Sequence, residues 1–252
     1  MRSLLQPIAH DSHSWIGRTD PRVRLVSAVG FSVVIAAADR FVVLAAALAV
    51  MACAAALSGP SPRVVARRLA LLNMLLLPLM LLLPLTTAGT TQWTLGPIEP
   101  TREGLLLAAT VAMKANAIML TLLSLLGSMD AVTLGHALSH LRMPDKLTHL
   151  LLLTVRYLDV LHGEMLRLRS AMRIRGFRPR MDRHTYRTYG YLIGMLLVRS
   201  FERSQRITDA MKCRGFRGRF YLLDHFAFSR RDVPFSVAST VTLLTLAWLQ
   251  WR

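Results

Sequence analysis

Five long apolar runs, separated by polar stretches, are the main feature of the chain. They cover residues 23–38, 41–57, 69–88, 104–127 and 233–251. A helix that spans a lipid bilayer needs about 20 mostly apolar residues, so each run is predicted to be a membrane-spanning helix. The first two runs are short and are separated only by Asp39 and Arg40, which favours a tight helical hairpin. The predicted fold class is therefore all-α: a polytopic membrane protein with about five transmembrane helices.

Two polar residues, Lys114 and Asn116, lie in the middle of the fourth run. A charge at that depth in a bilayer is costly and needs a compensating role or partner. One such role is a path for a substrate or an ion, and the other is bonding to carbonyls or hydroxyls of neighbouring helices. No acidic residue lies in any of the five runs to complete a relay, so the second interpretation is favoured.

The long insert between the fourth and fifth runs is predicted to form a helical domain. A short helix is expected over 129–141 and a long one over 185–214. Over 148–175, apolar residues recur at steps of three and four, which is the spacing of one face of a helix. Charged residues, Glu164 among them, fall outside this apolar face. The apolar stripe consists of Thr154, Leu158, Leu161, Met165, Leu168 and Met172.

The net charge of the chain is +17 although 53% of its residues are hydrophobic, because the charge lies between the apolar runs. Residues 129–232 hold twenty Lys and Arg against nine Asp and Glu. Basic residues accumulate in cytoplasmic segments, which predicts a cytoplasmic N-terminus and an external C-terminus. The predicted domains are four transmembrane helices within 1–128, a cytoplasmic coupling-helix domain at 129–232 and a last transmembrane helix at 233–252.

A ten-residue pattern occurs twice in the insert, at the expected ends of its two long helices. AMRIRGFRPR at 171–180 is followed 39 residues later by AMKCRGFRGR at 210–219. Gly176 and Gly215 are suited to the left-handed conformation that ends a helix, and a preceding arginine complements the negative end of the helix dipole. The two long helices are therefore predicted to end in the same way.

Helix capping alone does not require the sequence Arg-Gly-Phe at both ends. Arg175 and Arg214 would each present a rigid fork of donors suited to a carboxylate, with Phe177 and Phe216 offering apolar contact. Capping remains the simpler interpretation of either copy. The repetition favours docking, and it predicts a partner with two equivalent sockets, such as a dimer.

At these residues the chain resembles the T component of energy-coupling factor (ECF) transporters, the membrane scaffold of a class of ABC-type importers. Two Arg-Gly signatures in a cytoplasmic helical insert are the hallmark of that family. The likeness extends to DPRVRL at 20–25, LRMP at 141–144 and TVRYL at 154–158. The chain is more similar to the cobalt and nickel branch (CbiQ-like) than to the vitamin branch, which stays the alternative.

The resemblance implies a bacterial inner-membrane assembly of this scaffold, a membrane-embedded S component that captures the substrate, and two ABC-type ATPase subunits. The similarity of the two signatures favours an ATPase homodimer. ATP and Mg²⁺ would be used by the ATPases, and this chain would bind no cofactor and catalyse no reaction. Ile174 and Cys213 stand where the family usually has a small residue. The residues implied to dock the ATPases are Ala171, Ile174, Arg175, Gly176, Phe177, Ala210, Cys213, Arg214, Gly215 and Phe216.

The sequence agrees with a non-catalytic subunit. It contains no G-x-x-x-x-G-K-[ST] phosphate loop, so ATP hydrolysis by that route is expected on a partner. A membrane-bound enzyme acting on a lipid is a less favoured alternative, because no D-x-x-D or D-x-x-x-D pair is present to bind a metal. A nucleic-acid surface is disfavoured because aromatic residues are not interleaved with the charges, although attraction to anionic lipid is expected.

Metal binding by the chain is also disfavoured. Its two cysteines, Cys53 and Cys213, cannot form a disulfide framework or a four-ligand zinc site. Two histidine pairs have a spacing that can ligate a metal, but neither has an evident full ligand set, so surface or packing roles are expected. These pairs are His10 with His13 and His136 with His140.

Overall fold

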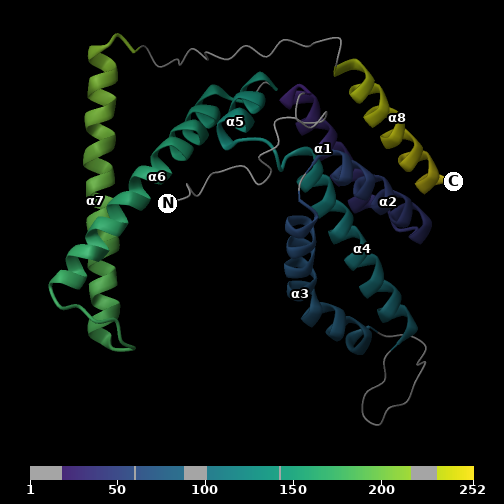
Figure 1. Ribbon diagram of the computed structural model, residues 1–252, viewed down its shortest axis with the longest axis horizontal. Helices are drawn as coiled ribbons and strands as arrows, with labels where there is room; N and C mark the ends of the chain where they lie inside the picture. Colours follow the sequence, from purple (N-terminus) through teal and green to yellow (C-terminus); the bar gives the residue numbers. More distant parts are fainter. Residues whose placement is uncertain (1–18, 60, 88–100, 142, 217–231) are drawn as a thin grey trace. The chain divides into compact units, whose positions relative to one another are not determined.

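The computed structural model describes residues 19–252 except 60, 88–100, 142 and 217–231. The described part contains eight helices (Figure 1). They are α1 (Pro21–Ala37), α2 (Phe41–Leu57), α3 (Pro62–Thr86), α4 (Arg102–Leu125), α5 (Ala131–His140), α6 (Asp145–Ile174), α7 (Arg183–Cys213) and α8 (Asp232–Trp251). The all-α expectation is confirmed for this part of the chain.

The helices group into two compact units. One contains α1 to α4, α8 and most of α5, and the other contains α6 and α7. The division falls at residues 138 and 225, so most of the short α5 belongs with the apolar helices. The domain boundaries expected at 129 and 232 stay predictions.

Three of the apolar helices, α3, α4 and α8, are long and apolar enough to cross a membrane. The described segments α1 and α2 have 17 residues each and are short for the same role. They are separated by residues 38–40, but α2 packs mainly against α4 and α8 rather than against α1, so the tight hairpin is not observed as a packed pair. The full set of five spans therefore stays a prediction. The apolar helices and the exposed leucines of α3, including Leu75 at 78% exposure, suit a lipid environment.

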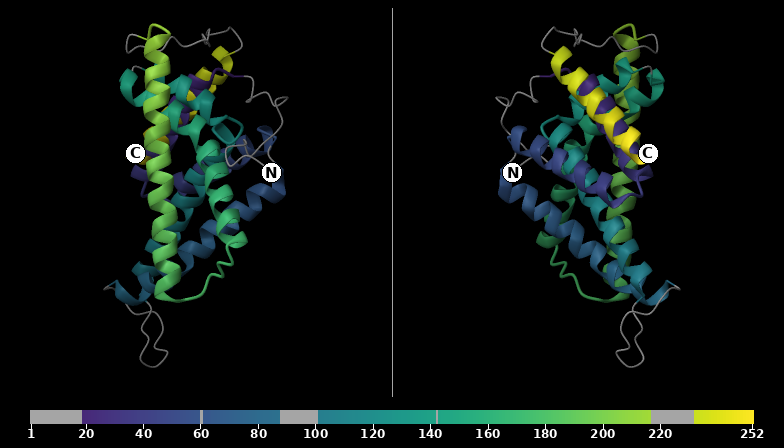
Figure 2. Two further views of the ribbon diagram at one scale, coloured as in Figure 1. Left: turned by 90° about the vertical axis from the view of Figure 1, so that its left-hand side faces the viewer. Right: turned by 90° about the vertical axis from the view of Figure 1, so that its right-hand side faces the viewer.

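Helix α4 is at the centre of the unit that contains α1 to α4 and α8, which we call the apolar unit, and it packs against α1, α2 and α3. Small buried residues such as Ala28, Ala47 and Ala117 let the helices approach one another closely. Helix α8 packs along α1 and α2, and the right-hand view of Figure 2 shows it lying along α1. Hydrogen bonds from Asp20 to Asp232 and from Ser27 to Ser239 show that α1 and α8 run in the same direction.

The two polar residues in the middle of α4 have partners on neighbouring helices. The Lys114 Nζ donates to the Ala36 carbonyl at 3.1 Å and pairs with an Asp39 carboxylate oxygen at 2.9 Å. Asn116 and Asn73 of α3 exchange side-chain amide hydrogen bonds of 2.9 and 3.1 Å. Bonding to neighbouring helices, the favoured interpretation, is therefore observed, with an acidic partner that lies in the turn between α1 and α2 rather than within a run.

Candidate functional site

Helices α6 and α7 form a crossed hairpin, in which α7 returns along α6 after the connection at 175–182 (Figure 1). The hairpin is joined near its centre by Glu164 of α6. Its carboxylate accepts hydrogen bonds from Arg199 of α7 and, at 3.3 Å, from Arg167 of α6. Glu164 is 8% exposed, so this residue is buried although it lies outside the predicted apolar stripe. It borders the apolar stripe, because Leu161 and Leu168 lie three and four residues away.

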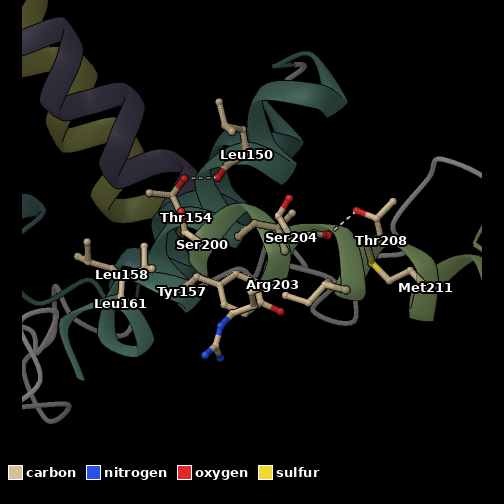
Figure 3. A pocket seen from close by; sticks show the side chains of 12 residues that line it. Leu150, Thr154, Tyr157, Leu158, Leu161, Ser200, Arg203, Ser204, Thr208 and Met211 are labelled. Atoms are coloured by element: carbon tan, nitrogen blue, oxygen red, sulfur yellow. Dashed lines mark hydrogen bonds between the residues drawn. The ribbon is translucent and has the colours of Figure 1, made fainter. Parts of the chain in front are cut away.

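An apolar groove of about 390 Å³ separates α6 from α7 on one side of this ion pair. Figure 3 shows leucines and Tyr157 of α6 facing a row of small hydroxyl side chains on α7. Thr154 and Thr208 on the two walls bond their hydroxyls to carbonyls of their own helices, those of Leu150 and Ser204. The predicted apolar stripe of α6 therefore faces α7 along part of its length. The groove is lined by Leu150, Leu153, Thr154, Tyr157, Leu158, Leu161, Ser200, Arg203, Ser204, Ile207, Thr208 and Met211.

The two helices end in the same hydrogen-bonded structure, as the repeated pattern predicted. At the end of α6, the Gly176 N–H donates to the Arg173 carbonyl at 3.0 Å and the Phe177 N–H to the Met172 carbonyl at 3.1 Å. The φ angle of Gly176 is +78°. This pair of bonds around a left-handed glycine is the Schellman motif, which satisfies carbonyls that a helix end leaves free.

The end of α7 repeats this geometry almost without change. The Gly215 N–H donates to the Lys212 carbonyl at 2.9 Å, the Phe216 N–H donates to the Met211 carbonyl at 3.0 Å, and the Gly215 φ angle is +81°. The arginine before each glycine is thereby fixed as the C-cap residue, directly after the last residue of its helix. Two sequence copies therefore produce two copies of one local structure.

Both signature arginines are exposed. No hydrogen bond or ion pair joins the guanidinium of Arg175 or Arg214 to another described side chain. Ile174 is 87% exposed and Cys213 is also exposed. Ala171, Gly176, Ala210 and Gly215 are exposed as well. Each helix end therefore presents a charged planar donor beside a small exposed surface, an arrangement that can bind a carboxylate.

The phenylalanines of the signatures are half-buried rather than fully presented to solvent. The Phe177 ring meets the Tyr189 ring of α7 edge-on at 5.9 Å between centroids, and the His184 ring lies at 6.3 Å. This packing attaches the end of α6 to the first turns of α7, a role that sequence reasoning missed. The spacing of Tyr189 along α7 gave no signal for it, because the contact depends on the path of the 175–182 connection.

The two arginine-bearing ends lie far apart along the hairpin. Phe177 contacts Tyr189, and 24 further residues of continuous helix lead from Tyr189 to Cys213. At 1.5 Å per residue this places the two ends roughly 36 Å apart along α7. The ends can therefore engage two separate binding sites at once, but cannot converge on one.

The described residues contain no group of three or more His, Cys, Asp or Glu side chains that could hold a metal ion. His136 and His140 are half-buried on α5, and Cys53 is exposed on α2. His10 and His13 lie outside the described residues, as do residues 217–219 of the second repeat.

Comparison with known proteins indicates the same family as the two repeated Arg-Gly signatures. An uncharacterized protein of Methanocaldococcus jannaschii, MJ1089, is 28% identical over 119 residues, which are 47% of this chain and 44% of the relative. The chain thus spans less than half the length of that relative in the match. Residues 12–222 match the family described as CbiQ, cobalt transport protein. Since this match includes α1 to α7 with both arginine-bearing helix ends, the chain belongs to the CbiQ family of cobalt transport proteins.

Proposed function

We propose that this membrane component of cobalt transport is the T component of an ECF-type importer, which couples an ATPase dimer to a substrate-binding S component. Arg175 and Arg214 insert into equivalent acidic sockets on the two ATPase subunits. When ATP and Mg²⁺ draw the subunits together, the docked helix ends follow, and the hairpin transmits this movement to the membrane helices.

One observation carries this proposal: the two helix ends have the same backbone geometry and both leave an arginine exposed. A cap alone needs only the glycine and the backbone bonds. Exposed guanidinium groups at matched, rigid positions suit a partner with matched carboxylates. A homodimer supplies such a pair of sockets by symmetry.

The proposed membrane-embedded partner is supported by apolar surface on α7. Seven large apolar side chains between residues 186 and 201 of this otherwise basic helix are exposed, which favours contact with an apolar partner or with lipid. They are Tyr186, Tyr191, Ile193, Met195, Leu197, Val198 and Phe201. We assign this surface to the S component, with the N-terminus and the hairpin on the cytoplasmic side of the cell membrane and the C-terminus outside.

The proposed substrate is the cobalt or nickel ion. Membership in a family described by cobalt transport supports it, and the vitamin importers remain the alternative within the same architecture. The ion would be captured by the S component. This chain would then contribute motion rather than ligands.

The test is a detergent pull-down of the tagged chain from its native membrane, with copurifying proteins identified by mass spectrometry. Wild type is compared with Arg175→Glu/Arg214→Glu. The control is Arg169→Glu/Arg206→Glu, which makes the same charge change at exposed arginines of the same two helices. We expect a P-loop ATPase with wild type and control, and its loss from the signature variant.

Two results would contradict the proposal. If wild type brings down no ATPase, the chain is not a coupling subunit. If the signature variant keeps the ATPase at the wild-type level, the arginines are helix caps and docking lies elsewhere. The other membrane proteins recovered with wild type would identify the S component and, by cobalt, nickel or vitamin binding, the substrate.

A further inference from the structure

The first turn of α1 forms two buried connections that the docking signatures do not explain. Asp20 and Arg24 are 8% and 2% exposed, and they lie four residues apart, so they share one face of the helix start. The Asp20 carboxylate accepts the Arg22 N–H at 2.9 Å and caps α1. Asp20 also contacts the start of α8, and Arg24 contacts the end of α4.

The first connection fixes the start of α8. The main-chain N–H of Asp20 donates to Oδ1 of Asp232 at 2.9 Å, and Asp232 is 3% exposed. Two turns further along both helices, the Ser27 and Ser239 hydroxyls lie 3.2 Å apart. The residue where α8 begins is therefore tied to the residue that caps α1.

The second connection fixes the end of α4. The Arg24 Nε donates to the Leu125 carbonyl at 2.8 Å, and its Nη2 donates to that carbonyl and, at 2.6 Å, to the Ser128 hydroxyl. Burying a guanidinium is costly unless its donors are satisfied, and the end of a helix offers carbonyls with partial negative charge. Arg24 thus binds the last turn of α4 and the residues that follow it.

These two attachment points have a common place in the chain. Leu125 and Ser128 lie just before the insert that contains α6 and α7, and Asp232 is the last residue of the insert and the first of α8. Both helices that border the insert pack against α1. One turn of α1 therefore holds the point where the chain leaves the apolar helices and the point where it returns.

We propose that Arg24 and Asp232 are positioning residues for energy coupling. They bind the two ends of the coupling insert, at the end of α4 and the start of α8, to α1. As a result α4 and α8 move together when the insert is displaced. This inference rests on the proposed function and assigns a role to the DPRVR segment that the docking mechanism leaves unused. Without these contacts of Arg24 and Asp232, which we call the clamp, movement of the insert would only displace the end of α4 or the start of α8 locally. ATP would still be hydrolysed, but less transport would result.

The test uses the complete transporter, purified with its ATPases and S component and reconstituted into liposomes. The readout is the number of cobalt ions imported per ATP hydrolysed, because a residue with only a stabilising role would lower yield, hydrolysis and transport together. The variants are Arg24→Met, Arg24→Lys, Asp232→Leu and Asp232→Asn. Arg40→Met is the matched control, since the Arg40 side chain is exposed in the same unit.

We expect Arg24→Met and Asp232→Leu to assemble with the ATPases and hydrolyse ATP, but to import about tenfold less cobalt per ATP. Arg24→Lys keeps a single donor group and Asp232→Asn keeps an acceptor for the Asp20 N–H, so both should recover part of the ratio. Arg40→Met should match wild type. An unchanged ratio in the two stronger variants, or a parallel fall of assembly, hydrolysis and transport even in the two conservative ones, would overturn the inference.

Failure of the proposed function is distinguishable from failure of this inference. In the first case the wild-type chain brings no ATPase into the complex and no ratio can be defined. In the second case the wild-type complex couples hydrolysis to import, and the clamp variants couple equally well.

Discussion

At the scale of single residues, the two Arg-Gly helix ends are determined locally. A left-handed glycine and two backbone hydrogen bonds within six residues are sufficient to build each end. The repeated Arg-Gly-Phe sequence adopts the same backbone geometry in both copies. Both guanidinium groups are exposed, as the proposed docking to an external partner requires. In the proposed mechanism, docking therefore depends on side chains that the fold of this chain does not itself use.

The glycine of each end should be replaceable by asparagine but not by alanine. A Cβ at Gly176 or Gly215 would meet no atom within 4 Å, so the penalty comes from the positive φ alone, and it should be about 1 kcal/mol for alanine. Asparagine tolerates that conformation better. Amide hydrogen exchange at 174–177 should therefore accelerate in Gly176→Ala and much less in Gly176→Asn.

Gly163, inside α6, provides the control for this comparison. Its position is also open, but it is helical, so Gly163→Ala should stabilise α6 by up to about 1 kcal/mol. Equal exchange in the Ala and Asn variants of Gly176 would mean that the left-handed cap does not maintain the end of the helix.

At the scale of helices, periodicity predicted the elements and missed the partners that cross between them. The stripe on α6 predicted a buried face, and part of it lines the groove against α7. Glu164 lies outside that stripe, as predicted, but periodicity did not indicate that it is buried and paired with Arg199 of α7. Lys114 is a similar case, since its partner Asp39 lies in a turn 75 residues away.

The Glu164 and Arg199 pair should stabilise the crossing of the hairpin. Arg199→Met should lower the free energy of unfolding by about 1 kcal/mol, because Glu164 is nearly buried while the arginine is 45% exposed and partly screened. Glu164→Gln/Arg199→Met should recover part of that loss. Chemical denaturation of the detergent-solubilised protein, arranged as a double-mutant cycle, measures the coupling.

The pair of Asp209 and Lys212 offers a comparison on the same hairpin. These side chains are 72% and 68% exposed and 3.7 Å apart, so their coupling energy should be close to zero. If both pairs gave the same coupling, burial at the crossing would not be the cause of stabilisation.

At the scale of the whole molecule, the separation of the two arginine-bearing ends limits the kind of partner that the proposed docking allows. Ends roughly 36 Å apart along one helix require two sockets on a large partner or on two subunits. Two attachments in one assembly also act cooperatively, because the second binding event is intramolecular.

Single charge reversals should therefore weaken ATPase binding without abolishing it. Arg175→Glu and Arg214→Glu should each lower the affinity of the purified chain for its ATPase by roughly tenfold or more, and by similar factors, because the two ends are equivalent. The double variant should show no measurable binding. Titration by biolayer interferometry, with Arg169→Glu as the control, tests this. A large inequality between the two single variants would mean that the sockets differ.

The sequence by itself determined the all-α class, the apolar and basic segregation, the helical insert and its two matched ends. All of these depend on short-range periodicity, local capping or composition, and they are encoded within a few turns of helix. The family likeness noted from the signatures agrees with the family match over residues 12–222.

Only the tertiary structure decided which distant residues meet. The contacts of Arg24 with Leu125, Asp20 with Asp232, Lys114 with Asp39 and Phe177 with Tyr189 depend on helix packing and on the path of connections. No local pattern encodes such pairs, because each residue alone has several chemically equivalent partners. The packing of the helices selects one of these partners. It thereby brings both ends of the insert, at the end of α4 and the start of α8, to a single turn of α1.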